Sequence, residues 1–178
     1  MKWRDLAGDP TTLTGNASGN ASVTSAGRSA VLVFKTGDQV MPQLHQWCEQ
    51  QRITAAHFTA IGAFERVTVA WFDWDAKQYR EIPIDEQVKV LSLAGDVACN
   101  GDKPAVHAHI VVGLRDATTR GGHFVDGTVR PTLELVLHET PAHLRKRHDP
   151  ESGLALIDPS YYLLGCGTLQ LIFGFTPA

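Results

Sequence analysis

Cysteine is scarce in this chain of 178 residues, which contains only Cys48, Cys99 and Cys166. The three are far apart in the sequence and no pair has the Cys-x-x-Cys spacing. An odd count of scattered cysteines is typical of a protein from a reducing compartment, and none has the surroundings of a catalytic thiol.

Long apolar runs and excess basic charge are also missing. No stretch resembles a secretory signal or approaches the length of a membrane span, so we expect a cytoplasmic protein without membrane contact. The 16 Lys and Arg are balanced by 19 Asp and Glu, for a net charge of −3. This balance argues against a general nucleic-acid binder, which usually carries a basic face. No glycine-rich phosphate loop precedes a helix.

Short apolar runs separated by turn residues make up most of the chain. Its length and its hydrophobic content of 43% predict one domain with a sizeable core. One helix is predicted, with Asp38 as its N-cap and its end near Gln51. Its inner stripe should be Val40, Leu44, Trp47 and Cys48.

The strands follow from alternating and β-branched runs. They are predicted at residues 30–35, from Thr54 to a glycine-centred bend at 61–63, and at 67–73, 78–84, 88–98 and 131–138, with another strand bearing His107 and His109. Short turns join consecutive strands, which favours antiparallel pairing and an α+β fold with one principal helix. A further turn is expected at Asp126–Thr128. Gly95 suggests a bulge or a close backbone approach.

Three segments are expected along the chain, the first of them from its composition. Residues 1–29 are rich in Thr, Ser, Gly and Asn and are interpreted as a mobile arm in which we place no strand. Residues 30–139 form the domain. Residues 140–178 form an extension packed on the domain or on a neighbouring subunit, in which the apolar alternation of Tyr161–Phe175 suggests a last strand or a docking arm.

The stretch from His107 to His123 carries the strongest chemical signal. His107 and His109 are two residues apart on a predicted strand, so both imidazoles should project from one face. His123 follows Gly121 and Gly122, whose freedom permits a close or positive-φ backbone that returns the third imidazole to the other two. Three converging imidazoles would bind Zn²⁺ or another divalent transition metal and leave a coordination position open. Alternatively, His107 and His109 are half-buried strand residues bonded to backbone carbonyls, and His123 only caps a turn.

Glu134 is the second candidate. It lies on a predicted strand, on the face opposite Leu133, Leu135 and Leu137, with mostly apolar neighbours. A carboxylate on a largely buried face needs a partner. That partner is either an arginine across the sheet or a subunit interface, or the histidine site, where Glu134 would act as an acid/base group or support the ligands.

Several motifs resemble the PPC (DUF296) domain of plants and prokaryotes. They are Ile53–Phe64, Val88–Gly95, His107-Ala-His-Ile, Gly121–Val129 and Thr132–Leu137, in the family's order. The resemblance covers about residues 30 to 139. It implies an α+β domain that assembles as a homotrimer, and the outward aromatic residues Trp71, Phe72 and Trp74 suit a subunit interface. The plant proteins carry an Arg-Gly-Arg-Pro core that grips DNA, and this chain has none.

The domain is also similar in fold to acetolactate decarboxylase, a zinc enzyme with a His-x-His pair and a later histidine. That resemblance implies His107, His109 and His123 as metal ligands without carrying over the reaction. Arg115 or Arg120 would then meet a small anionic substrate. We expect a metal-binding homotrimer, with enzymatic activity left open. The alternative is a DNA-binding or protein-binding regulatory module without catalysis.

Overall fold

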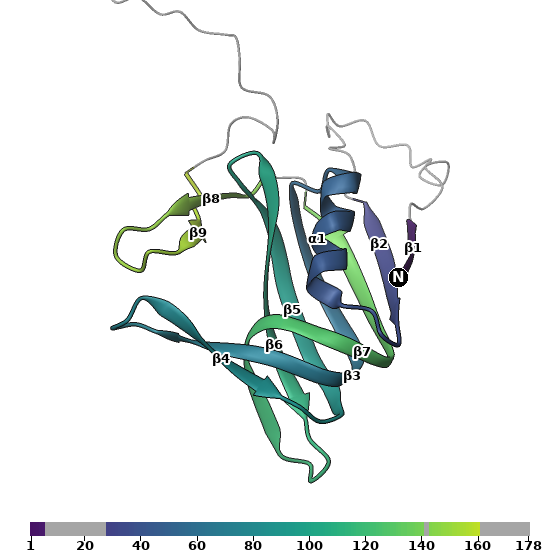
Figure 1. Cartoon of the computed structure of the whole chain (residues 1–178). Coiled ribbons are helices and arrows are strands. Elements are labelled where there is room, and N and C mark those ends of the chain that lie inside the picture. Colours follow the sequence, from purple (N-terminus) through teal and green to yellow (C-terminus); the bar gives the residue numbers. More distant parts are fainter. Residues whose placement is uncertain (6–27, 141–142, 161–178) are drawn as a thin grey trace, which may run out of the picture.

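The computed structural model describes residues 1–5, 28–140 and 143–160. In these residues it is mainly antiparallel sheet with a single helix, which confirms the α+β class (Figure 1). The elements are β1 (Lys2–Asp5), β2 (Ser29–Lys35), α1 (Val40–Gln51), β3 (Ala55–Asp73), β4 (Gln78–Ile84), β5 (Val88–Asn100), β6 (Lys103–Gly113), β7 (Thr119–Glu139), β8 (Arg145–His148) and β9 (Ala155–Ile157).

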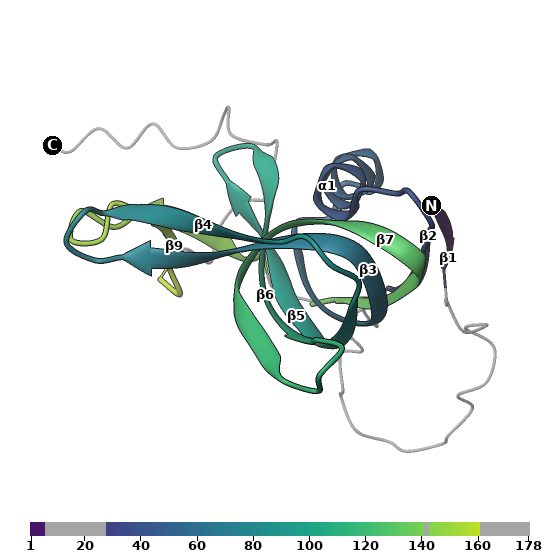
Figure 2. The same ribbon diagram turned by 60° about the horizontal axis from the view of Figure 1, so that its bottom comes forward.

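Two long strands, β3 and β7, organise the sheet. Its order is β1-β2-β7-β3-β5-β8-β9, with β4 on β3 and β6 between β5 and β7. The pairings β3–β5, β5–β6, β6–β7 and β7–β3 therefore close a ring of four strongly curved strands, visible end-on in Figure 2. All described pairings are antiparallel except that of β5 with β8.

The core lies between this curved sheet and α1, which packs over β6 and β7. The predicted helix stripe of Val40, Leu44, Trp47 and Cys48 is buried, as are Leu133, Leu135 and Leu137 on β7. Each fully buried side chain of this kind contributes roughly 1.5–3 kcal/mol. The alternation along β7 therefore fixes which of its faces points away from the core.

The start of α1 differs from the prediction. Gln39 occupies the N-cap position without a side-chain hydrogen bond, so Asp38 as the N-cap was wrong. The Asp38 carboxylate instead accepts hydrogen bonds from the Lys35 amide and the Gln43 side chain. The Met41 amide in the first helical turn donates to Asp126 of β7, at 3.0 Å. The capping carboxylate thus comes from a distant strand.

The turn predicted at Asp126–Thr128 is also wrong, because β7 continues through it. Gly127 pairs with Val67 of β3, and a Cβ on this glycine would lie 2.9 Å from the Phe64 ring. The Asp-Gly dipeptide therefore serves packing rather than chain reversal. The bend predicted at 61–63 appears as bulges within the continuous strand β3, where the register shifts between Ala60 and Gly62.

Both ends of the chain add to this picture. No strand was placed in residues 1–29, yet β1 lies there and pairs with β2. The predicted segment Tyr161–Phe175 lies outside the described residues. Within the described part of the chain, no helix has the length and apolar character that a bilayer crossing requires.

Two hairpins leave the sheet on the same side of the molecule. One is formed by the second half of β3 with β4, and the other by β8 with β9 (Figures 1 and 2). A turn at residues 150–152 lies between β8 and β9.

Candidate metal centre

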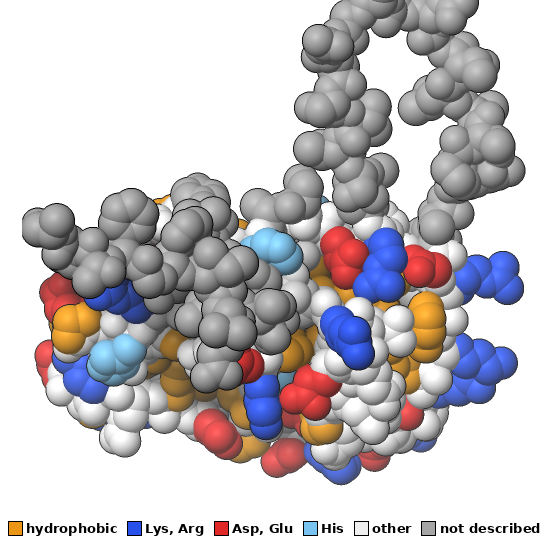
Figure 3. Space-filling view, turned by 90° about the horizontal axis from the view of Figure 1, so that it is seen from above, with side chains coloured by type: hydrophobic (Ala, Val, Ile, Leu, Met, Phe, Trp, Pro, Cys, Tyr) orange, Lys and Arg blue, Asp and Glu red, His pale blue; other side chains and the backbone are white. Residues whose placement is uncertain are grey.

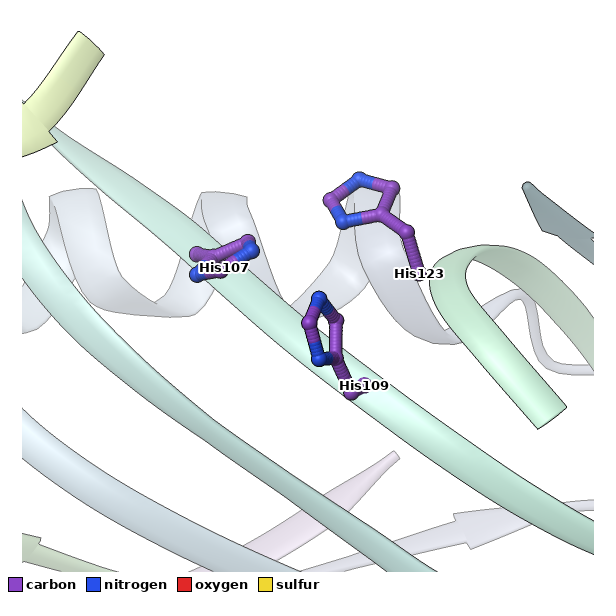
Figure 4. Close-up of side chains that lie close together, drawn as sticks. All are labelled: His107, His109 and His123. Atoms are coloured by element: carbon purple, nitrogen blue, oxygen red, sulfur yellow. The ribbon is translucent and has the colours of Figure 1, made fainter. Parts of the chain in front are cut away.

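Three histidines from β6 and β7 lie together beneath the two hairpins. His107 and His109 share one face of β6, while Ala108 and Ile110 between and beyond them are buried on the other. His123 is the direct pairing partner of His109 across the β6–β7 ladder. The side chains point toward one another (Figure 4), and one potential ligand nitrogen from each lies within 4.8 Å of the other two.

Glycines allow the strands to come this close. A Cβ on Gly121 would lie 2.6 Å from the Ile110 carbonyl oxygen, and one on Gly122 would lie 2.8 Å from that of Ala70. Neither glycine has a positive φ. The sequence left open whether the two glycines provide a positive φ or a close backbone approach, and the structure shows the close approach. Gly95 plays the same part under β6, where a Cβ would lie 2.5 Å from the His107 carbonyl oxygen.

The surroundings favour the neutral form of His109 and His123, which is the form that binds a metal. Burial and the neighbouring His107 and His109 lower the pKa of His123 to about 4. Burial, followed by the charge of His107, also lowers the pKa of His109. The Nδ1 atom of His123 is buried without a hydrogen-bond partner. An unpartnered lone pair beside two further imidazoles is what a transition-metal site offers, so the cluster could hold such an ion.

Asp96 of β5 lies next to His107 on the neighbouring strand. It pairs with His107 in the β5–β6 register, and its Oδ2 lies 3.4 Å from His107 Nδ1. A carboxylate there can accept the Nδ1 proton, which leaves Nε2 free as a ligand atom and fixes the ring. Its other oxygen, Oδ1, is buried without a hydrogen bond and lies 3.8 Å from Lys146 Nζ.

Tyr79 completes the immediate surroundings. Its ring stacks on that of His123, with centroids 4.4 Å apart and an interplanar angle of 25°. Sequence reasoning missed Tyr79, Asp96 and Lys146. The hairpin turn after Asn100 carried a signal for Asp96, because counting back from it pairs Asp96 with His107.

The histidines open into a cavity of about 850 Å³ between the two hairpins. Its remaining walls are largely apolar and come from β3, β6 and β9. A volume of this size suits a small organic ligand. Side chains lining it beside the site include Trp71, Phe72, Val111, Leu154, Leu156 and Ile157.

The other predicted site residues lie elsewhere. Glu134 is eleven residues beyond His123 on β7, pairs with Val33 and Ile61, and is exposed. The buried face expected for it is thus wrong for the single chain. Arg115 borders a separate hollow with Glu86 and Asp116. Arg120 pairs with Val112, on the ladder position next to Gly121, and is not among the residues that line the histidine cavity.

Solved structures share this fold. A plant- and prokaryote-conserved (PPC) protein from Pyrococcus horikoshii is 27% identical, with a TM-score of 0.70 over 75% of this chain and 93% of that one. A metal-containing protein from Archaeoglobus fulgidus is 28% identical, with a TM-score of 0.68 over 75% and 94%. A Bacteroides thetaiotaomicron protein, provisionally described as DNA binding, is 21% identical, with a TM-score of 0.71 over 74% and 92%.

The expected similarity to acetolactate decarboxylase is distant. A Staphylococcus aureus protein of unknown function, described as similar to that enzyme, gives a TM-score of 0.46 at 11% identity. No curated protein matches the chain significantly. The model of one family, the Plants and Prokaryotes Conserved (PCC) domain, matches residues 21–141. That match spans most of the sequence, and this chain therefore belongs to the Plants and Prokaryotes Conserved domain family.

Proposed function

We propose that this protein binds a divalent transition metal, zinc first among them, through His107, His109 and His123. The observation that carries the proposal is the convergence of three imidazoles whose ligand atoms lie within 4.8 Å of one another. Small side-chain rotations would place all three nitrogens around one zinc ion, each at the usual zinc–nitrogen distance of about 2.0–2.1 Å. Imidazole donors also suit copper, iron and nickel.

Three further observations support a metal at this place. The buried Nδ1 atom of His123 has no hydrogen-bond partner. Asp96 stands where a carboxylate would orient a ligating His107. The Archaeoglobus relative with the same fold, 28% identical, is described as metal-containing.

The three imidazole ligands determine which reactions a metal bound here could support. A metal held by three imidazoles keeps a position open, where it can activate water or polarise a carbonyl group. Within this chain, Asp96 would hold the His107 proton on Nδ1, and Tyr79 would keep the His123 ring in place. The apolar side chains that the two hairpins contribute to the cavity would exclude water from a bound ligand. A reaction is not assigned.

The assembly proposed is a homotrimer. Large apolar side chains are exposed in the single chain, among them Trp71 on β3 with 70% of its surface accessible and Ile61 with 63%. Apolar groups of this size on a protein surface commonly mark a contact with another chain. Light scattering coupled to gel filtration measures the assembly, and a monomeric mass would contradict it.

Elemental analysis of the purified protein tests the metal proposal. The wild type should carry one equivalent of metal per chain, and His123→Ala should carry none. His138→Ala is the matched control, because His138 is an exposed histidine on the same strand. It should retain the metal in full. A His123→Ala variant that keeps its metal would contradict the ligand assignment.

A DNA-binding regulatory module is the second candidate. Proteins of this fold from Bacteroides thetaiotaomicron and Ralstonia eutropha are provisionally described as DNA binding, and Arg145–His148 is a basic strand. Against it, the net charge is −3, and acidic and basic side chains are interspersed on the face shown in Figure 3. Fluorescence anisotropy with duplex DNA at physiological salt separates the two, since tight, salt-sensitive binding would favour this candidate.

A further inference from the structure

The cavity in front of the histidines contains a lysine that the metal proposal does not use. Lys146 lies on β8, and its side chain is only 10% exposed. Among the described residues that line the cavity, Lys146 and Asp96 are the ones with full charges beside the neutral histidines. A lysine this well buried requires compensation, because removing an ammonium group from water is costly.

Asp96 provides only part of that compensation. The 3.8 Å between Lys146 Nζ and Asp96 Oδ1 is too long for a hydrogen bond. The other oxygen of the same carboxylate faces His107. With a divalent cation on three neutral imidazoles, the residues around the cavity would carry a net positive charge. An anion is therefore the ligand that electrostatics favours.

The shape and lining of the cavity narrow the choice of anion. Its volume of about 850 Å³ exceeds what a bare inorganic ion fills, and apolar area dominates its surface. The walls include the aromatic side chains of Trp71, Phe72 and Tyr79. Such walls suit a ligand with an apolar body, whereas a polyphosphate or a nucleic-acid strand would lose its hydration there without gaining partners.

We propose that the ligand of this site is a small organic carboxylate with an apolar or aromatic body, and that Lys146 binds its anionic head. The body lies between the β3–β4 and β8–β9 hairpins. This proposal deepens the proposed function, since it places the ligand beside the metal. The predicted role of Arg115 and Arg120 then falls to Lys146.

The proposed binding group lies outside the part of the chain that matches the family model. Lys146 and the wall residues Leu154–Ile157 lie beyond residues 21–141, the part that matches the family model. The C-terminal segment thus adds a charged group and an apolar wall to a site built by the shared domain. Ligand preference would be set by residues that the family match does not cover.

Calorimetric titration with phenylacetate and with neutral phenylacetamide tests the proposal on the full chain, both zinc-loaded and metal-free. The wild type should bind phenylacetate about tenfold tighter than phenylacetamide or more, since a hydrogen bond to a charged group contributes about 1.5–3 kcal/mol. In the metal-free protein, where no bound cation attracts the carboxylate, Lys146→Met should remove this preference and leave phenylacetamide binding unchanged. Lys146→Arg should keep the preference. Lys89→Met is the matched control, because Lys89 is exposed and outside the cavity.

The outcomes separate the two proposals. Zinc content is measured on every variant. A wild type that does not retain zinc contradicts the metal proposal. The titrations of metal-free protein then still test the role of Lys146. Full zinc content with equal affinity for the two probes contradicts the carboxylate proposal alone. An unchanged preference in metal-free Lys146→Met also contradicts it, as does no binding of either probe up to its solubility limit.

Discussion

Two histidines on β7 illustrate how surroundings decide what an imidazole does. His123, near the start of the strand, faces two other histidines and a cavity, and its buried Nδ1 atom has no hydrogen-bond partner. His138, near the end, is exposed, lies beside His57 with ring centroids 5.3 Å apart, and shares a 2.7 Å hydrogen bond with Ser29. The first imidazole is unsatisfied and enclosed, whereas the second is satisfied and solvated. A bound metal would stabilise the first arrangement and add little to the second.

The largest expected effect concerns how closely the strands approach around His123. Gly121→Ala should destabilise the metal-free protein by about 3 kcal/mol, because the added Cβ would meet the Ile110 carbonyl oxygen at 2.6 Å. Urea denaturation gives the value. Gly101→Ala meets no atom within 4 Å and has φ near +61°, so it should lose only about 1 kcal/mol. Equal losses would show that the strands are not closely packed at the site.

The two carboxylates considered for the site give the next comparison. Asp96→Asn should weaken zinc binding by about 10- to 100-fold, because an amide orients a ligating imidazole less well than a carboxylate. Glu134→Gln, whose side chain is exposed on the face of β7 opposite Leu133 and Leu135, should leave zinc affinity unchanged. Competition with a chromogenic chelator measures both. A loss in Glu134→Gln as large as that in Asp96→Asn would restore Glu134 to the site.

A third comparison sets Asp38, a carboxylate that stabilises the fold, against the residues of the metal site. Burial raises the pKa of Asp38, but hydrogen bonds from Lys35, Gln43 and the Met1 amino group outweigh it and lower the pKa to about 2. Since the folded pKa lies below the ordinary 3.8, the ionised carboxylate stabilises the fold above that pH and ceases to do so as the pH falls toward 2.

Asp38→Asn should therefore lower stability by about 1–2 kcal/mol at neutral pH, after allowance for solvent screening. The difference from wild type should shrink as the pH falls from 4 to 2, and zinc affinity should not change. Urea midpoints across this pH range provide the measurement. A constant difference at all pH values would exclude ionisation as its cause.

The smallest effect concerns the side chain that contacts each histidine, Tyr79 beside His123 and Ser29 beside His138. Tyr79→Leu removes the ring stacked on His123 and should reduce zinc affinity by about three- to tenfold, the equivalent of roughly 0.5–1.5 kcal/mol for an aromatic pair. Ser29→Ala removes the partner of His138 and should leave zinc affinity as it is. The same chelator competition applies, and a matching loss in Ser29→Ala would contradict the distinction between the two histidines.

Strand alternation was sufficient to predict much of the architecture and the shared face of His107 and His109. The approach of His123 to the pair was predicted from Gly121 and Gly122, which act here through close backbone approach. The N-cap was mispredicted because the carboxylate at the start of α1 comes from Asp126, a tertiary contact that no local motif encodes. The Asp-Gly turn signal was likewise overridden by packing against Phe64.

The remaining parts of the site needed pairings that the sequence does not determine. Lys146 reaches the cavity through the parallel pairing of β8 with β5, whose register no short hairpin turn sets. Tyr79 stacks on His123 only because β3 carries β4 over the β6–β7 ladder. Glu134 looked buried because its apolar neighbours suggested a covered face, and that face is open in the single chain.

Anomalous diffraction at the zinc absorption edge, from crystals grown with zinc, tests the central claim most directly. The account predicts one strong peak per chain within bonding distance of His107, His109 and His123. An absent peak, or a peak at His57 and His138 instead, would contradict it.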